Sequence, residues 1–267
     1  MTISRAIVLA LACSLMGCTR RSPAPPTDAP PSLQLFLLAG QSNMAGRGAV
    51  EAQDRVPVDG IVMLDRNLAW VPAIDPVHFD KSVAGVGPGR GFALALHATE
   101  PSVTIGLVPT AVGGSPISSW EPGAFDAATK THPYDDALAR ARAARRDGRF
   151  RAILWHQGES DATPEHSILY ATRLRALIAR LRSDLGEPEL PFIIGQLGQF
   201  PRSSWTAARE RVDSAQRAIA ATTPNVAFVT SDGLQHRGDN LHFNSASARE
   251  LGRRYAAAYL DLVRKRR

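Results

Sequence analysis

The sequence predicts an α/β fold, a three-layer α/β/α sandwich with a mostly parallel central sheet. Three observations carry this prediction. The chain has 267 residues with 44% hydrophobic content, which is enough for one sizeable core. Apolar runs of strand length alternate with segments whose apolar residues recur at helical spacing. No repeat recurs at a fixed period and no internal linker divides the chain, so one main domain is expected.

The first expected strand, 33–39, reads LQLFLLA and is apolar almost throughout. A strand of a parallel sheet has this composition when helices cover both of its faces. The stretch 44–86 fits the alternation less well, and we expect loops there around one short strand. Further strands are expected at 60–65, 103–109, 152–156, 192–196 and 226–230.

Helical spacing occurs between these strands. In 164–185 the apolar stripe begins at Ile168, and Thr163 with Pro164 has the residue types of an N-cap and a first helical position. The last helix is expected to begin near Asn244. The other helical segments are expected at 91–99, 134–146 and around 205–219.

The N-terminal segment 1–17 resembles a bacterial lipoprotein signal peptide. Arg5 precedes an apolar core, and the segment ends in LMGC, which includes Cys18. An ordinary secretory signal or a short membrane anchor is the alternative, although the apolar run is short for a spanning helix. The Pro-rich stretch 18–32 is typical of an extended tether. We therefore expect a domain at 33–267, held by lipid at the bacterial cell envelope, periplasmic or surface-exposed.

Composition limits the classes of partner. Cys13 would leave with the signal and Cys18 would carry lipid, so no cysteine remains for a disulfide, a metal site or a nucleophile. The net charge of +6 comes largely from arginines, many of them in 140–151 and 264–267. An anionic partner or a solvated helix face would each explain these clusters. No nucleic-acid motif accompanies them, so we expect no nucleic-acid partner.

Polar residues follow several of the expected strands. Because ligands bind beyond the carboxyl ends of parallel strands, these residues are expected to meet at one edge of the sheet. They are Ser42 after 33–39, Gly113 and Gly114 after 103–109, Gln157, Glu159 and Asp161 after 152–156, and Asp239 and His242 after 226–230.

These residue types are sufficient for acyl transfer. A serine hydroxyl such as that of Ser42 needs a base, and the base needs an orienting group. His242 and Asp239 can share one short loop in these roles. Glycine N–H groups and a side-chain amide can stabilise the oxyanion that forms. Each piece also has a structural interpretation: the serine as a helix N-cap, the glycines as a turn, the histidine as a core or surface residue.

Four stretches together resemble the sialate O-acetylesterase and acetylxylan esterase branch of the SGNH (GDSL-like) hydrolases, whose fold is flavodoxin-like. They are LLAGQSNMAG, AVGGSPISSW, WHQGESD and DNLHF, and they extend from residue 37 to 243. The resemblance implies that Ser42 is the nucleophile, His242 the general base and Asp239 the orienting acid. It also implies oxyanion donors from the N–H groups of Ser42 and Gly114 and from the Gln157 side chain. Gln157 stands where many SGNH enzymes have asparagine.

The sequence leaves some roles open. Glu159 is a rival or additional acid for the imidazole, because this branch has a recurrent acid there. Asn43 and Gly113 are candidate substrate contacts, although Asn43 is equally suited to holding the turn after the strand. Among the tryptophans we expect Trp120 at the rim of the cleft as a sugar platform and Trp155 in the core.

The predicted function is a carbohydrate O-acetylesterase that forms an acetyl-serine intermediate and needs no metal or organic cofactor. The expected partners are an acetylated carbohydrate, of the xylan or sialic-acid type, and a membrane reached through the lipid anchor. Two alternatives stay open: a catalytically silent glycan-binding lipoprotein of the same fold, and an esterase for other short-chain esters.

Overall fold

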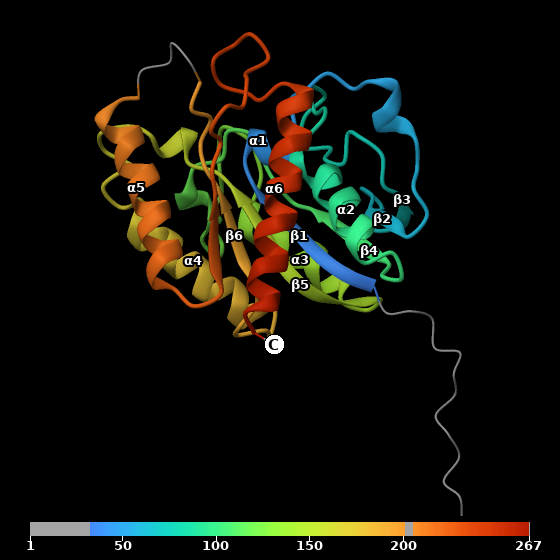
Figure 1. The fold of residues 1–267 in the computed structure, drawn as a ribbon. Coiled ribbons are helices and arrows are strands. Elements are labelled where there is room, and N and C mark those ends of the chain that lie inside the picture. Colours follow the sequence, from blue (N-terminus) through green and yellow to red (C-terminus); the bar gives the residue numbers. More distant parts are fainter. Residues whose placement is uncertain (1–32, 201–204, 267) are drawn as a thin grey trace, which may run out of the picture. The chain divides into compact units, whose positions relative to one another are not determined.

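The central sheet has seven strands in the order β3-β2-β4-β1-β5-β6-β7. β2 and β3 pair antiparallel, and all the other pairings are parallel. The predicted mostly parallel sheet is therefore confirmed. The strands, shown in Figure 1, are β1 (Leu33–Gly40), β2 (Ile61–Leu64), β3 (Trp70–Pro72), β4 (Ile105–Pro109), β5 (Gly148–His156), β6 (Phe192–Gly195) and β7 (Val226–Val229).

The computed structural model describes residues 33–200 and 205–266. The predicted signal peptide (1–17) and tether (18–32), and Cys18 with them, lie outside the described residues. The assignments made there stay predictions. β1 begins at Leu33, the first described residue.

Helices cover the sheet on both faces. α2 and α6 pack on one face, while α3, α4 and α5 pack on the other. In Figure 1, α6 and α2 cross in front of the strands. The three-layer prediction is therefore confirmed. The helices are α1 (Ser42–Ala45), α2 (Pro88–Thr99), α3 (Pro133–Ala144), α4 (Tyr170–Asp184), α5 (Ala207–Thr222) and α6 (Ser245–Arg264).

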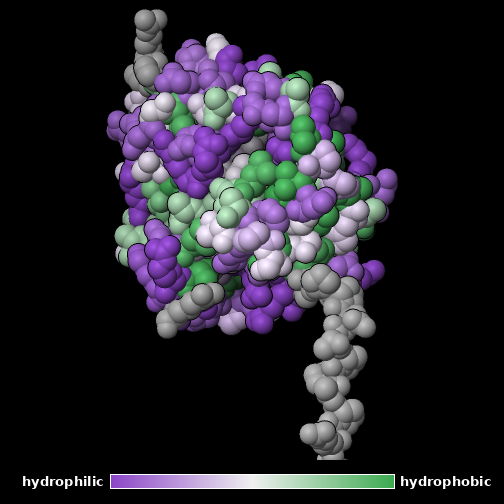
Figure 2. All heavy atoms as spheres, turned by 45° about the vertical axis from the view of Figure 1, so that its right-hand side comes forward, coloured by the Kyte–Doolittle hydropathy of each residue, from purple (hydrophilic) through white to green (hydrophobic). Residues whose placement is uncertain are grey.

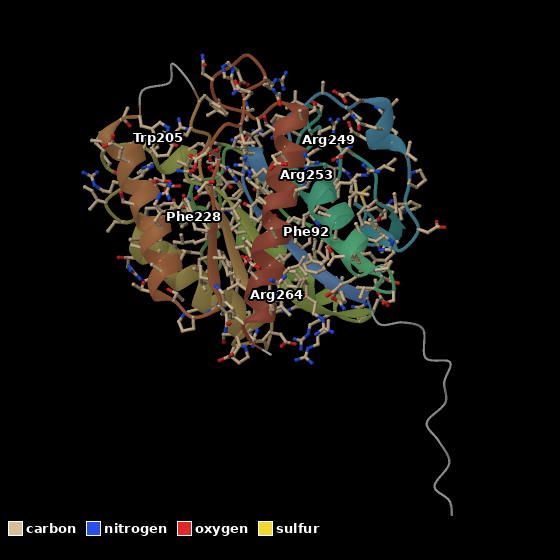
Figure 3. The ribbon with its side chains drawn as sticks, viewed as in Figure 1. Phe92, Trp205, Phe228, Arg249, Arg253 and Arg264 are labelled. Carbon is tan, nitrogen blue, oxygen red and sulfur yellow. The ribbon has the colours of Figure 1, made fainter. Side chains whose placement is uncertain are left out.

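β1 is apolar on both faces because it lies at the centre of these layers. Leu35 and Leu37 belong to the hydrophobic cluster on the side of α3, α4 and α5. Phe36 and Leu38 belong to the cluster on the side of α2 and α6. The ring of Phe36 lies 4.8 Å from that of Phe92 on α2, which Figure 3 labels. Burying such side chains stabilises the fold by about 1.5–3 kcal/mol each.

The predicted start of the helix in 164–185 is wrong. Thr163 does cap a turn, since its Oγ1 accepts a hydrogen bond from the N–H of His166 (3.2 Å). That turn does not continue, and α4 begins only at Tyr170. Ile168 is 67% exposed and does not join the apolar stripe. The chain instead turns so that the buried Tyr170 hydroxyl reaches the carbonyl of Gln157 (2.9 Å).

The segment 44–86 contains one strand more than predicted. β3 is only three residues long and pairs antiparallel with β2 through a tight turn. The Asp65 carboxylate closes this turn by accepting hydrogen bonds from the N–H groups of Asn67 and Ala69, both at 2.8 Å. Leu68 takes a positive φ of 63° there. So short a strand has no alternating pattern long enough to be recognised in the sequence.

The surface carries hydrophobic and charged regions side by side. Figure 2 shows hydrophobic side chains gathered around a hollow, with hydrophilic side chains around them. A cavity of about 580 Å³ between α2 and α6 is lined by Val56, Leu94, Arg249 and Arg253 among others, and by none of the predicted site residues. Figure 3 shows these two arginines on α6. None of the helices in residues 33–200 and 205–266 is long and apolar enough to cross a membrane.

Candidate active site

Ser42 is held where β1 ends. Gly40 has a φ of 127°, which favours glycine, and a Cβ at this position would lie 2.1 Å from the carbonyl oxygen of His156. The N–H of Gln41 then donates to that same carbonyl (2.8 Å). The chain therefore leaves the sheet at once, and Ser42 becomes the first residue of the short helix α1.

The structure brings Ser42, His242 and Asp239 together. Ser42 Oγ lies 3.0 Å from His242 Nε2, and His242 Nδ1 lies 2.7 Å from Asp239 Oδ2. The other carboxylate oxygen of Asp239 accepts hydrogen bonds from the N–H groups of Leu241 (3.0 Å) and His242 (2.8 Å). The loop after β7 thus folds around Asp239, and both imidazole nitrogens have a partner of the kind that serine acyl transfer needs.

Asp239 is suited to stay ionised beside the imidazole. Burial raises its pKa, but hydrogen bonds from the His242 and Leu241 backbone and from the His242 ring outweigh this effect. The pKa of Asp239 falls from 3.8 to about 2 as a result. An ionised carboxylate is the form that orients the imidazole and stabilises its positive charge.

Glu159 does not contact His242. Its Oε1 accepts a hydrogen bond from Asn43 Nδ2 (2.6 Å) and lies 3.7 Å from His156 Nε2. Burial raises the pKa of Glu159, yet the nearby His156 ring and the hydrogen bond from Asn43 lower it overall to about 2. The expectation that Glu159 could be a partner of the imidazole is therefore wrong, and Asp239 takes that place.

Gln157 is not placed as an oxyanion donor. Its side chain is fully buried, and its amide nitrogen donates to the Ser115 carbonyl (3.2 Å) and to the carboxylate of Asp161. Both amide hydrogens are thus engaged, so this prediction is wrong. Burial raises the pKa of Asp161, while its bonds from Gln157 and the Ile117 N–H act in the opposite direction. Asp161 is fully buried, and its carboxylate holds the Gln157 amide and the Ile117 N–H in place.

The glycine pair divides into two different roles. The N–H of Gly113 donates to Asp80 Oδ2 (2.9 Å). It is therefore not available to a substrate, and the predicted contact through this group is wrong. Gly114 has a φ of 93°, and its N–H has no hydrogen bond among the described residues. The same holds for the N–H of Ser42 within the described part of the chain. These two N–H groups are therefore free to donate, and their role as oxyanion donors stays a prediction.

Two other predicted substrate contacts are also corrected. Trp120 is fully buried, with its ring 5.0 Å from that of Trp155 and its Nε1 donating to Ser115 Oγ (3.0 Å). Its short 3₁₀-helix, Ile117–Trp120, turns the ring into the core, so it cannot be a sugar platform. Asn43 is 3% exposed and its amide is engaged inside the protein, so it does not face a substrate.

Sequence reasoning missed the residues that hold the glycine loop. Asp80 and Arg47 form a buried ion pair at 2.8 Å, and the Asp80 carboxylate also accepts a hydrogen bond from the Gly113 N–H. Asp80 does not directly follow an expected strand and belongs to none of the four motifs, so only the fold reveals its place. Among the described residues, no group of three or more His, Cys, Asp or Glu side chains could hold a metal ion.

Comparison with known proteins agrees with this geometry. The model of the family "Carbohydrate esterase, sialic acid-specific acetylesterase" matches residues 32–261. A probable carbohydrate esterase of Arabidopsis thaliana is 36% identical over 262 residues, which cover 90% of this chain and 93% of that one. A crystal structure of an Arabidopsis thaliana protein matches with a TM-score of 0.76 and 34% identity, covering 86% of this chain and 99% of that chain.

A carbohydrate acetylesterase from Xanthomonas citri shares the fold, with a TM-score of 0.68 and 21% identity over 87% of this chain and 57% of that chain. The sheet order and the helices on both faces define a three-layer α/β/α protein, in which Ser42 lies at the end of β1 and His242 in the loop after β7. The chain belongs to the sialic acid-specific acetylesterase family of carbohydrate esterases.

Proposed function

We propose that this esterase removes O-acetyl groups from carbohydrates through an acetyl-serine intermediate at Ser42. The observation that carries the proposal is the continuous path from Ser42 Oγ to His242 Nε2 (3.0 Å) and from His242 Nδ1 to Asp239 (2.7 Å). A serine becomes a competent nucleophile when a base accepts its proton and a carboxylate orients that base.

In the first half-reaction His242 accepts the Ser42 proton while Oγ attacks the acetyl carbonyl carbon. The carbonyl oxygen becomes an oxyanion, which the N–H groups of Ser42 and Gly114 can stabilise. The tetrahedral intermediate collapses, and the bond from carbon to the sugar oxygen breaks. His242 gives its proton to that oxygen, so the sugar alcohol leaves and acetyl-Ser42 remains.

In the second half-reaction water takes the place of the sugar. His242 accepts a proton from water as it attacks the acetyl carbonyl, and it returns that proton to Ser42 Oγ as acetate leaves. The imidazole is therefore neutral at the start and the end of the cycle. Asp239 stays a carboxylate throughout, in keeping with its pKa of about 2.

Two cavities are lined in part by residues that are neighbours in sequence of the site residues. One of about 340 Å³ is lined by Asp80 and Val112, and one of about 500 Å³ by Arg47 and Arg237; neither is lined by Ser42 or His242. The Arg237 guanidinium lies 3.9 Å from Asp239. The family description supports acetylated sialic acid, and acetylated xylan is the second substrate that we propose.

Acetate release from three substrates tests the proposal: acetylated xylan, O-acetylated sialic acid and 4-nitrophenyl acetate, each beside the matching butyryl ester where one exists. Acetate from a carbohydrate substrate, with butyryl esters hydrolysed more slowly, is the expected result. Equal or faster hydrolysis of butyryl esters would favour an esterase for other short-chain esters. Carbohydrate binding without release of acetate from any substrate would favour a silent glycan-binding protein.

We also propose that the mature chain is anchored to the bacterial cell envelope by lipid at Cys18, because LMGC and the Pro-rich stretch follow a signal-like segment. The full chain expressed in bacteria should fractionate with membranes and carry lipid on Cys18 in mass spectra. Cys18→Ala should carry none. An unmodified N-terminus produced by cleavage at another site would contradict the anchor.

A further inference from the structure

We propose that Asn43 is a positioning residue that clamps the loop around His242 to the nucleophile turn, and that Glu159 fixes the orientation of its amide. The inference rests on the catalytic roles proposed for Ser42 and His242. It assigns Glu159 to the geometry of the base, through Asn43, and not to proton transfer.

The Asn43 side chain bonds to the residues on both sides of His242. Its Nδ2 donates to the carbonyl of Leu241 (3.1 Å), and its Oδ1 accepts from the N–H of Phe243 (3.1 Å). Asn43 follows Ser42 directly in α1, a four-residue helix that is buried throughout. The two bonds therefore fix the backbone before and after the imidazole relative to the serine that the imidazole must reach.

Glu159 selects one orientation of the Asn43 amide. The second hydrogen of Nδ2 goes to Glu159 Oε1 at 2.6 Å, a charge-assisted bond to a carboxylate that is 5% exposed. If the amide turned over, its oxygen would face this carboxylate and the Leu241 carbonyl, and its nitrogen would face the Phe243 N–H. The buried negative charge opposes that arrangement.

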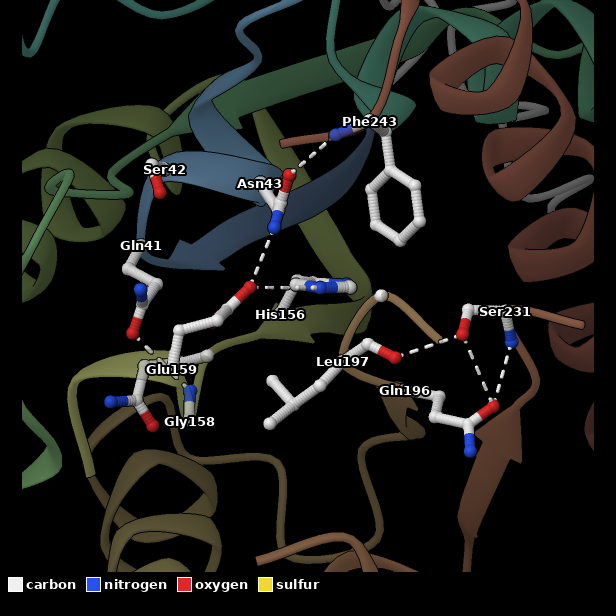
Figure 4. Close-up of polar contacts among 12 residues, drawn as sticks. Gln41, Ser42, Asn43, His156, Gly158, Glu159, Gln196, Leu197, Ser231 and Phe243 are labelled. Atoms are coloured by element: carbon white, nitrogen blue, oxygen red, sulfur yellow. Dashed lines mark hydrogen bonds and ion pairs between the residues drawn. The ribbon is translucent and has the colours of Figure 1, made fainter. Parts of the chain in front are cut away.

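His156 contacts both Glu159 and Phe243. Its Nε2 lies 3.7 Å from Glu159 Oε1, and its ring packs edge to face against Phe243 with centroids 5.6 Å apart. Figure 4 shows Asn43 between Phe243 and Glu159, with His156 beside them. Glu159 therefore holds the catalytic loop through Asn43 and faces His156, whose ring packs on the same Phe243.

Loss of the hydrogen bonds made by Asn43 should lower kcat. Removing these bonds frees the loop to shift His242 away from the 3.0 Å separation from Ser42. A displacement of about 1 Å at a reacting group can lower the rate about a hundredfold. Asn43 is buried and does not face the substrate, so KM should change little.

The test compares Asn43→Ala, Asn43→Asp, Glu159→Gln and Glu159→Ala in the full chain. Asn67→Ala and Glu165→Gln are matched controls, since both residues are exposed and outside the site. The readouts are kcat and KM with 4-nitrophenyl acetate, the rate at which a fluorophosphonate labels Ser42, and thermal unfolding. Labelling reports how well His242 activates Ser42, whatever the natural ester is.

We expect Asn43→Ala to lower kcat about a hundredfold and to lower the labelling rate by the same factor, while KM stays nearly unchanged. Glu159→Gln keeps an acceptor for the Asn43 amide, so it should lose less than Glu159→Ala. Folded Asn43→Ala and Glu159→Ala variants with wild-type labelling rates would overturn the clamp. Slow labelling together with wild-type kcat would overturn it as well.

Asn43→Asp supplies a signature that a packing role alone would not produce. It places a second carboxylate against Glu159, and two carboxylates in contact cannot both stay ionised, so the pair should take up a shared proton as pH falls. The labelling rate relative to wild type should therefore rise toward acid pH. A ratio that is constant with pH would contradict the clamp, and this variant decides the matter if Asn43→Ala does not fold.

The two levels of proposal fail separately. Wild-type protein that is labelled at Ser42 but releases no acetate from carbohydrates would refute the proposed substrate and leave the clamp intact. Acetate release from carbohydrates together with unaffected clamp variants would refute the clamp alone.

Discussion

His242 Nδ1 lies 2.7 Å from Asp239 Oδ2, while the carboxylate of Glu159 bonds Asn43 instead. We therefore predict a larger loss of turnover in Asp239→Asn than in Glu159→Gln. An asparagine at 239 can still accept the Leu241 and His242 N–H groups through its oxygen, but it cannot hold the imidazole in the required tautomer. In a serine triad this change costs about 10⁴ in kcat.

Steady-state kinetics on both purified variants measures this difference, with circular dichroism as the check that each is folded. A near-normal kcat in Asp239→Asn beside a collapse in Glu159→Gln would give the orienting role to Glu159.

Gln157→Leu should destabilise the protein more than it slows the reaction. The change leaves the Ser115 carbonyl without the donor it has now, and Asp161 keeps only the bond from the Ile117 N–H, inside the core. An unpaired buried polar group costs about 1–3 kcal/mol. The unfolding temperature should fall while kcat of the folded protein stays within about tenfold of wild type, whereas losing an oxyanion donor costs about 10²–10³.

Thermal unfolding and kcat measured on the same preparation separate the two roles of Gln157. Wild-type unfolding with a kcat lowered by the larger factor would restore Gln157 to the oxyanion site.

Glu159 should make stability depend on pH in the acid range. The pKa of an ordinary glutamate is 4.5, and that of Glu159 in the folded protein is about 2, because the nearby His156 ring and the Asn43 hydrogen bond outweigh burial. A lowered pKa stabilises the folded state above the ordinary pKa, and this contribution is lost as pH falls through the folded value. The free energy of unfolding should therefore decline less steeply in Glu159→Gln than in wild type below pH 4.5.

Urea unfolding at a series of pH values measures this slope, and Glu165→Gln is the control because Glu165 is exposed. Parallel pH dependences for wild type and Glu159→Gln would show that the carboxylate is not held ionised by its surroundings.

The layers, and the side of the sheet on which Ser42, Asp239 and His242 lie, could be predicted because short local patterns indicate them. A strand that is apolar on both faces predicts a covered parallel strand, and a serine directly after it must lie at the edge of the sheet. Asp239 and His242 are three residues apart, so one loop brings them together.

The errors concern side-chain direction, which tertiary contacts decide. Trp120 turns inward because its 3₁₀-helix packs it on Trp155. Gln157 follows its strand as expected, but its amide donates hydrogen bonds to Asp161 and to the Ser115 carbonyl, so it points away from the oxyanion site. Asp80 belongs to no motif, and it meets Gly113 only because the fold joins residues 33 positions apart.

The central claim is that Ser42 is the nucleophile, and Ser42→Ala tests it most directly. Acetate release should be measured for wild type and for the variant, with thermal unfolding to show that both are folded. The hydroxyl that lies 3.0 Å from His242 is absent in the variant, so kcat should fall by about 10⁴–10⁶. A folded Ser42→Ala protein that releases acetate at the wild-type rate would contradict the mechanism.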